Sequence, residues 1–229
     1  WAFCLRKPLW GPGGKLEGFA PWTIRPDAND LARYPAARRD ETGAAVVNLP
    51  HALVARQGVD AVAYAVGDNR VRLMRGGGEV EFAQPDGPGG DIAYRVVTGD
   101  DPLGWKAAVP AEALAGKPFS PRQWLSMTLA TDYPDSPAQI LAYFRSRHAG
   151  DLVAFAAPGW DFGESNKSGH GGLRPADMFV PLLIAGPGIP KATLPVARSV
   201  DLMPTILSLL GKPVPPGLDG RSLVDVKQP

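Results

Sequence analysis

The six residues from Val180 to Ala185 constrain the fold of this chain more than any other stretch. They read Val-Pro-Leu-Leu-Ile-Ala, and a Gly-Pro-Gly turn follows at 186–188. A short, branched, apolar run that ends in a turn is typical of a strand covered on both faces. The sequence therefore predicts a buried strand of a parallel sheet here, with helices on both faces.

Other segments fit the same layered arrangement. Helices are predicted at 121–131 and 137–147, where Ser120 and Ser136 are suited to cap the first turn and a proline takes the first helical position. A second buried strand is predicted at 151–157. Further predictions are a short helix capped by Asn48, a strand at 59–66 and a last helix at 201–210. Helix followed by strand favours a doubly wound α/β sheet.

The segment from 70 to 97 has a different pattern. Apolar and polar residues alternate at 70–74, 79–82 and 92–97, and glycine-rich turns separate these runs. Alternation of this kind predicts an antiparallel meander. On an α/β domain such an insertion often forms a cap that shapes substrate access. We therefore expect an inserted β cap.

His170 is the candidate metal ligand. It lies in Ser-Gly-His-Gly-Gly at 168–172, and the glycines allow a sharp turn and a close approach of the backbone. A neutral imidazole on a loop beyond the carboxyl end of a sheet strand is well placed to bind a metal ion. The alternative is an ordinary hydrogen-bonded histidine.

Other charged side chains lie on the same loop: Asp161, Glu164, Lys167, Arg174 and Asp177. The first two could orient a metal-bound imidazole, and Lys167 or Arg174 could meet a phosphate oxygen. Solvated charges and surface salt bridges are the alternatives for these four. Asp177 fits a turn or a helix cap better than a metal ligand.

The remaining residues capable of chemistry have structural interpretations. His51 falls in the opening turn of a predicted helix, and His148 follows the end of another, where positive charge suits the helix dipole. Asp100 and Asp101 precede a proline and indicate a turn. A single cysteine, Cys4, excludes an internal disulfide and a multi-cysteine zinc site.

Four motifs occur in a fixed order: His-Gly-Gly at 170–172, Val-Pro-Leu-Leu-Ile-Ala-Gly-Pro-Gly-Ile at 180–189, Asp-Leu-Met-Pro-Thr-Ile-Leu at 201–207 and Leu-Asp-Gly-Arg-Ser-Leu at 218–223. In this order they resemble the C-terminal end of the alkaline phosphatase superfamily, closest to its type I phosphodiesterase/nucleotide pyrophosphatase branch. Sulfatases share the last two motifs. The resemblance covers about residues 150–225.

The resemblance implies a hydrolase that uses two metal ions, usually zinc, beside a Ser or Thr nucleophile. It implies a phosphate or phosphodiester small molecule as substrate. Of the first metal's expected ligands, an Asp and two His, the late His corresponds to His170. The nucleophile and the Asp-His pair have no counterpart in this sequence, so no catalytic residue is assigned.

We therefore expect the C-terminal portion of a metal-dependent phosphodiesterase- or phosphatase-like hydrolase, inactive as this fragment. In this interpretation residues 1–57 are an irregular segment and a short helix of the truncated core. Residues 58–104 are a strand and the cap, and 105–229 the C-terminal part of the α/β core. Alternatives are a sulfatase-type or phosphomutase-type member, and a non-catalytic binding module from a degenerate member.

Charge and hydropathy bear on whether the chain binds nucleic acid or spans a membrane. Lys and Arg number 24 against 23 Asp and Glu, so no nucleic-acid footprint is expected. No run approaches the roughly 18 apolar residues of a membrane-spanning helix. No motif indicates a compartment or an oligomeric state.

Overall fold

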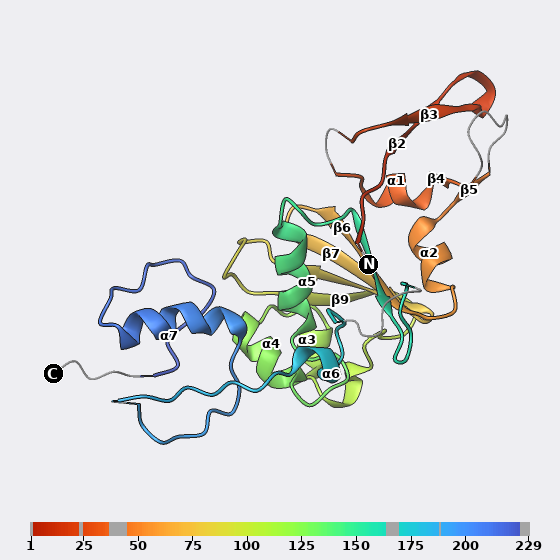
Figure 1. Cartoon of the computed structure of the whole chain (residues 1–229). Helices are drawn as coiled ribbons and strands as arrows, with labels where there is room; N and C mark the ends of the chain where they lie inside the picture. Colours follow the sequence, from red (N-terminus) through yellow and green to blue (C-terminus); the bar gives the residue numbers. More distant parts are fainter. Residues whose placement is uncertain (1, 23–24, 37–44, 164–169, 188, 225–229) are drawn as a thin grey trace. The chain divides into compact units, whose positions relative to one another are not determined.

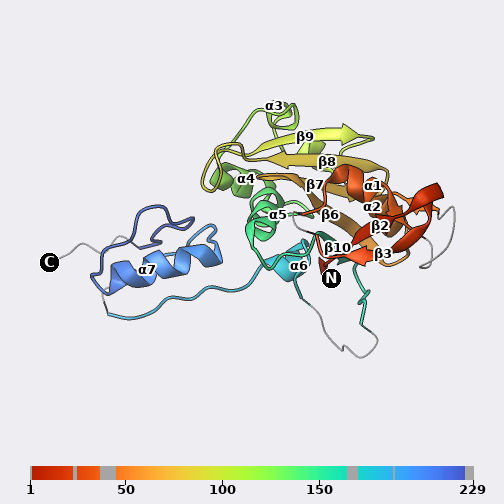
Figure 2. The ribbon, with the colours of Figure 1, turned by 90° about the horizontal axis from the view of Figure 1, so that it is seen from above.

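The computed structural model describes residues 2–22, 25–36, 45–163, 170–187 and 189–224. The chain forms two compact units, Trp1–Met178 and Phe179–Pro229, and each is described by itself. Figures 1 and 2 show a sheet with its helices in the first unit, and one labelled helix with irregular segments in the second. Within the described ranges, no helix combines the length and the apolar character needed to cross a bilayer.

The first unit is built on a six-stranded sheet. Its strands, in spatial order, are β1 (Ala2–Phe3), β10 (Leu152–Ala156), β6 (Val59–Gly67), β7 (Arg70–Arg75), β8 (Gly78–Ala83) and β9 (Ala93–Thr98). All five neighbouring pairs are antiparallel. The chain therefore combines helices with an antiparallel sheet.

The prediction of a doubly wound parallel sheet is wrong. The strand predicted at 151–157 exists as β10, but it runs antiparallel to β6. The reason is that an apolar run indicates burial and not the direction of the neighbouring strand. Residues 61–65 of β6 are all buried, because helices cover both faces of this central antiparallel strand. Such a run indicates coverage on two faces and carries no information about strand direction.

The predicted meander is confirmed as strands, and its interpretation as an inserted cap is wrong. The runs at 70–74, 79–82 and 92–97 correspond to β7, β8 and β9. However, β7 pairs along β6, with Val62 opposite Met74 and Ala63 opposite Leu73. These strands therefore continue the main sheet. The alternation indicated that one side of the meander is more polar than the other. This holds for strands at the outer part of a main sheet as well as for a cap, so the pattern could not distinguish them.

Helices on one face enclose the larger core. They are the 3-10 turn η2 (Trp105–Ala107) and the helices α3 (Ala111–Leu114), α4 (Pro121–Thr128) and α5 (Ser136–Arg145). Helix α5 lies across the sheet in Figure 1 and places Ile140 and Leu141 in the same apolar cluster as Leu73. Next to it, the rings of Tyr94, Trp105 and Trp124 pack with centroids 5.2–5.8 Å apart.

The opposite face is covered by α1 (Ala28–Ala32) and α2 (Leu49–Val54). Leu31, Leu49 and Leu53 pack with Val62 and Tyr64 of β6. Two helix caps that were predicted are confirmed. Asn48 accepts a hydrogen bond from the His51 backbone at the start of α2, and Ser120 forms a capping box with Gln123 in α4.

The predicted Ser136 cap is wrong. Asp135 occupies the cap position of α5 in a left-handed conformation (φ 56°), and Ser136 is already the first helical residue. The segment expected to be irregular also contains regular structure. A hairpin joins β2 (Lys7–Trp10) to β3 (Leu16–Ala20) through η1 (Pro12–Gly14), and β4 (Tyr34–Pro35) pairs with β5 (Val46–Val47).

In the second unit the predicted helix at 201–210 is confirmed as η3 (Ser199–Asp201) followed by α7 (Leu202–Leu209). The buried strand predicted at 180–185 is wrong. That segment has no regular structure, and Val180 and Leu183 are 76% and 91% exposed. A strand needs a hydrogen-bonded neighbour as well as an apolar sequence, and the described residues of this unit include no strand.

The aromatic cluster generates a stability prediction. Trp124 is fully buried, and its indole N–H donates to the carbonyl of Ile92 at 2.7 Å. Trp124→Ala should therefore lower the free energy of unfolding by about 3–5 kcal/mol, as expected for a large core side chain. Urea unfolding followed by circular dichroism measures it.

The matched control is Trp10→Ala, because Trp10 lies on the hairpin and is 41% exposed. Its effect should stay within about 0.5 kcal/mol. Equal effects of the two substitutions would contradict the assignment of Trp124 to the centre of the core.

Candidate functional site

The loop that carries His170 starts at a fixed point on the sheet. It leaves β10 at Ala157, whose backbone N–H donates to the Gly58 carbonyl at 2.8 Å. The Trp160 ring then packs directly on Gly58, where an added Cβ would lie 2.6 Å from a ring carbon. Gly58 also has a left-handed φ of 83°. The first turn of the loop is thus fastened to the start of β6.

His170 lies in an irregular, exposed segment. Gly171 follows with φ 94°, a conformation that favours glycine. A Cβ on Gly172 would lie 2.0 Å from a carboxylate oxygen of Asp177. The backbone conformation therefore favours glycine at 171, in agreement with the sharp turn predicted from the sequence, whereas a side chain at 172 would require the Asp177 carboxylate to move.

The loop is fastened to the sheet again directly after these glycines. Leu173 is 6% exposed and belongs to the larger core. Arg174 pairs with Asp60 of β6, and the short helix α6 (Pro175–Met178) begins at the next residue. The glycine turn of His170 is thus bounded on its C-terminal side by a buried side chain and an ion pair.

Asp60 is the residue on which this second attachment depends. Phe155 of β10 pairs with Ala61 and Ala156 pairs with Val59, which leaves Asp60 as the extra residue of a β-bulge. A bulge re-aims a side chain relative to the regular pleat. The carboxylate of Asp60 is 9% exposed, so it needs partners.

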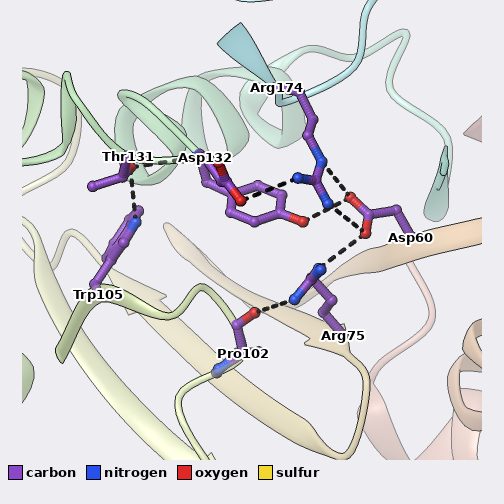
Figure 3. A network of polar contacts seen from close by, with 8 residues as sticks. Asp60, Arg75, Pro102, Trp105, Thr131, Asp132 and Arg174 are labelled. Carbon is purple, nitrogen blue, oxygen red and sulfur yellow. Dashed lines mark hydrogen bonds and ion pairs between the residues drawn. The ribbon is translucent and has the colours of Figure 1, made fainter. Parts of the chain in front are cut away.

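Three side chains satisfy that carboxylate (Figure 3). One oxygen accepts from Arg75 Nε at 2.9 Å and from Arg174 Nη2 at 3.2 Å. The other accepts from the Tyr133 hydroxyl at 2.8 Å and from Arg174 Nε at 3.3 Å. Arg174 therefore binds Asp60 through two nitrogens, which fixes its orientation as well as its distance.

Tyr133 organises the two arginines around the carboxylate. The guanidinium carbons of Arg75 and Arg174 lie 5.1 and 4.8 Å from the centre of its ring, within the range of cation–π attraction. Arg174 also pairs with Asp132 at 3.3 Å, and Arg75 donates to the Pro102 carbonyl. Arg174, a sequence candidate for a phosphate contact, is thus engaged by two carboxylates of the protein.

The network shifts the pKa values of Asp60 and Tyr133. Burial alone would raise the pKa of Asp60, but hydrogen bonds from Tyr133, Arg174 and Arg75 outweigh it and hold that pKa below its usual value. Burial, together with the hydrogen bond to Asp60, raises the pKa of Tyr133. Asp60 is therefore ionised and Tyr133 neutral at neutral pH.

The other charged residues of the loop are placed as follows. The Asp161 carboxylate accepts from the Gly163 backbone at 2.7 Å and stabilises a local turn. Asp177 lies in the first turn of α6 with its carboxylate beside Gly172. Glu164 and Lys167 lie outside the described residues.

The two other histidines and the Asp100–Asp101 pair, to which the sequence analysis gave structural roles, lie in different elements. His51 lies in α2, and His148 lies beyond α5, where it accepts from Arg147 Nε at 3.2 Å. Asp101 accepts from the Tyr94 hydroxyl and from the backbone of Leu103, which closes the predicted turn. Within the described part of the chain, no group of three or more His, Cys, Asp or Glu side chains could hold a metal ion.

In the second unit, the last two motifs of the resemblance bind each other. Asp201 is fully buried, and its carboxylate accepts from the backbone of Arg198 and of Arg221, both at 2.9 Å. The Thr205 hydroxyl accepts from the Leu223 backbone at 3.0 Å. A Cβ on Gly220 would lie 2.0 Å from the Val200 carbonyl oxygen. These motif residues therefore stabilise the fold of the second unit.

Sequence reasoning missed Asp60, Arg75 and Tyr133. One signal was present: Asp60 is the single charged residue in the apolar run from 59 to 66. A charge within a buried strand requires a partner. The identity of the partners, which come from β7, from the loop after α4 and from the loop after β10, could not be read from spacing.

The network generates a pH prediction. Because the pKa of Asp60 is lowered on folding, its contribution is fully present above the unfolded value of about 3.9 and is lost as the pH falls through the folded value. Asp60→Asn should therefore reduce stability most at neutral pH, and the difference from the unmodified chain should narrow toward pH 2. Urea unfolding at several pH values measures it, and parallel curves would contradict the paired carboxylate.

The buried Asp201 gives a second prediction. Asp201→Ala removes the acceptor of two backbone N–H groups, an expected cost of about 1–3 kcal/mol for each group left buried and unsatisfied. Amide exchange at Arg221 should accelerate strongly, while amides of the first unit should keep their rates. Hydrogen exchange with mass spectrometry measures both, and unchanged exchange at Arg221 would refute the linkage.

Comparison with protein-family models, with curated proteins and with solved structures finds no match for this chain. The function is therefore inferred from the residues and geometry described above.

Proposed function

We propose that the chain forms the C-terminal part of a metal-dependent phosphoric ester hydrolase of the phosphodiesterase or phosphatase type, with His170 as one metal ligand. The observation that carries the proposal is an exposed imidazole in a glycine turn that is attached to β6 on its C-terminal side by the ion pair between Arg174 and Asp60. A metal ligand must be held on a rigid support to act at a defined position, and this turn supplies one.

The proposal draws on the motifs at 170–223 and draws nothing from the sheet. The antiparallel sheet of the first unit differs from the parallel sheet that the resemblance implies. The two late motifs have a folding role in the second unit. His170 is therefore the residue of this chain that would take part in the reaction, as a metal ligand.

Two zinc ions are the cofactor that the proposal implies. When bound, they would stabilise the negative charge of a phosphoryl transition state and activate a Ser or Thr nucleophile. The contribution of this chain is a neutral imidazole nitrogen. Catalytic zinc takes three protein ligands, so the other donors and the nucleophile would come from residues outside this sequence.

A non-catalytic binding module remains the second candidate. The observation in its favour is that the first unit has its own core between two layers of helices, without a cluster of metal-binding side chains among its described residues. The outer part of its sheet also carries Arg70, Arg72 and Arg95 around the buried Glu81. A polar face of this kind suits recognition of another molecule.

Zinc content separates the two candidates. The protein made from the complete reading frame that encodes this chain should contain two zinc ions and hydrolyse bis(p-nitrophenyl) phosphate. His170→Ala should remove one ion, because the affected site loses an imidazole ligand. It should lower kcat/KM by more than the 10–100-fold typical of a residue that only supports a ligand. Inductively coupled plasma mass spectrometry measures the metal.

His148→Ala is the matched control, since this histidine is also exposed but lies beyond α5. It should leave zinc content and rate unchanged. The 229-residue chain alone should bind Zn²⁺ more weakly than about 1 μM, equivalent to about 8 kcal/mol. A complete protein without zinc, or one whose zinc survives His170→Ala, would overturn the hydrolase proposal.

A further inference from the structure

We infer that β7, β8 and β9, on the side of the sheet opposite α5, bind an extended acidic segment of a partner protein. The residues that would meet this segment are Arg70, Arg72 and Arg95, and we call the surface that they form the arginine face. The inference goes beyond the hydrolase proposal, because it needs no metal. It also gives the second candidate, the binding module, a partner of defined chemistry.

Helices α1 and α2 cover one part of this side of the sheet. The apolar cluster beneath them contains residues of β1, β10, β6 and β7, and among the described residues it contains none of β8 or β9. The arginine face lies in the remaining part. The side chains of Arg70 and Arg95 are 49% and 63% exposed there, so both can reach another molecule.

The strand register gathers the arginines around one carboxylate. Arg72 of β7, Glu81 of β8 and Arg95 of β9 lie directly opposite one another. Arg70 lies two residues before Arg72 and therefore on the same side of the sheet. Arg70 Nη2 and Arg95 Nη2 lie 2.7 and 3.5 Å from one oxygen of Glu81, and Arg72 Nε lies 3.2 Å from the other.

Buried carboxylates hold the arginines in place. The side chains of Glu81 and Glu79 are 5% and 7% exposed. Burial raises the pKa of Glu81, but hydrogen bonds from Arg70 and Arg72 outweigh it and hold that pKa below its usual value. Glu79 accepts a hydrogen bond from the Tyr64 hydroxyl and pairs with Arg72 at 3.8 Å. This anchoring lowers the entropy cost of ordering the arginines when a ligand binds.

The arginine face has more positive charge and more donors than its own carboxylates use. Three arginines face two glutamates, which leaves one positive charge. Two carboxylates provide about eight acceptor positions, whereas three guanidinium groups provide about fifteen N–H donors. Arg70 and Arg95 each donate to Glu81 through a single nitrogen. They can therefore bind a second carboxylate without releasing Glu81.

The spacing of the arginines fits an extended chain. Arg70 and Arg72 are two residues apart on one strand, a separation of about 6–7 Å. Alternate side chains of an extended peptide repeat at the same distance on one side. Beside Arg70 the row across the sheet continues with Ala83 and Ala93, whose small side chains leave room for a peptide backbone. Carboxylates at alternate positions of a peptide therefore match this face.

Charge and composition favour an acidic peptide over a nucleic acid. The whole chain has a formal net charge of +1, whereas nucleic-acid-binding domains are typically strongly basic. Sequence-tolerant binding of single strands also uses exposed aromatic rings on which bases stack. The ring directly opposite Arg72 in the register, that of Tyr64, is buried. The forked donors of arginine suit carboxylates well.

The test measures binding of a fluorescein-labelled peptide of alternating Glu and Thr to the 229-residue chain by fluorescence anisotropy. EDTA in the buffer excludes binding through a metal. Binding should weaken as salt is added, because exposed charges are screened. A peptide with the repeat Glu-Glu-Thr-Thr has the same composition and charge, but none of its Glu residues lie two positions apart. It should bind about 2–5-fold more weakly, because it loses one exposed ion pair.

Substitutions locate the binding surface. Arg70→Gln and Arg95→Gln should each weaken binding of the alternating peptide about 2–5-fold, the range of one exposed ion pair. Arg95→Glu should weaken it more than about tenfold, because a like charge then faces the peptide. Arg95→Lys should retain most of the affinity, since the charge stays. Arg147→Glu is the matched control, because Arg147 is also exposed but lies beyond α5. It should leave binding unchanged.

The comparison of the two peptides needs no substitution, so it does not depend on the folding of any variant. Equal binding of the two peptides, absence of binding, or an equal loss in Arg147→Glu would overturn the inference. Tighter binding of an oligothymidylate of equal charge, lost in Arg95→Glu, would assign the arginines to a nucleic acid and overturn it as well. Zinc content and hydrolysis should not change in Arg95→Glu, so the hydrolase proposal fails or survives by a separate measurement.

Discussion

A carboxylate placed in the bulge of a covered strand must be paired, and much of the first unit is arranged around that requirement. Asp60 draws together Arg75 from β7, Tyr133 from the loop after α4 and Arg174 from the loop after β10. Loss of any one partner would leave a charge nine-tenths buried and less well satisfied. The network therefore ties sheet, helical layer and glycine turn into one arrangement.

Around this network the apolar core does the larger part of the stabilisation. Central strand β6 packs on α5 through Ala61 and Ala63 and on α2 through Val62 and Tyr64. Burial on both faces explains why its sequence is apolar almost throughout. The second unit is stabilised differently: the side chains of its buried Asp201 and Thr205 accept hydrogen bonds from the backbone of the segment at 221–223.

The candidate site could be predicted in part. The glycines beside His170 indicated a sharp turn, and Gly171 has the positive φ of 94° that favours glycine. Arg174 was recognised as a charged loop residue, but its partner lies 114 positions earlier in the chain. A pairing over that separation has no local signal. The assignment of His170 to zinc stays a prediction, because the described residues include no group of side chains that could hold a metal ion with it.

The sequence by itself determined where most of the longer helices and strands lie, but not the short elements of the first 45 residues. Periodicity, the caps Asn48 and Ser120 and the glycine turns act over a few residues, and these elements occur where they were expected. The direction and neighbours of the strands were decided by the tertiary structure. An apolar run such as 151–157 satisfies a parallel or an antiparallel neighbour equally well, and the run at 180–185 shows that apolar character alone does not make a strand. Strand pairing is a property of two distant segments, and neither segment specifies it alone.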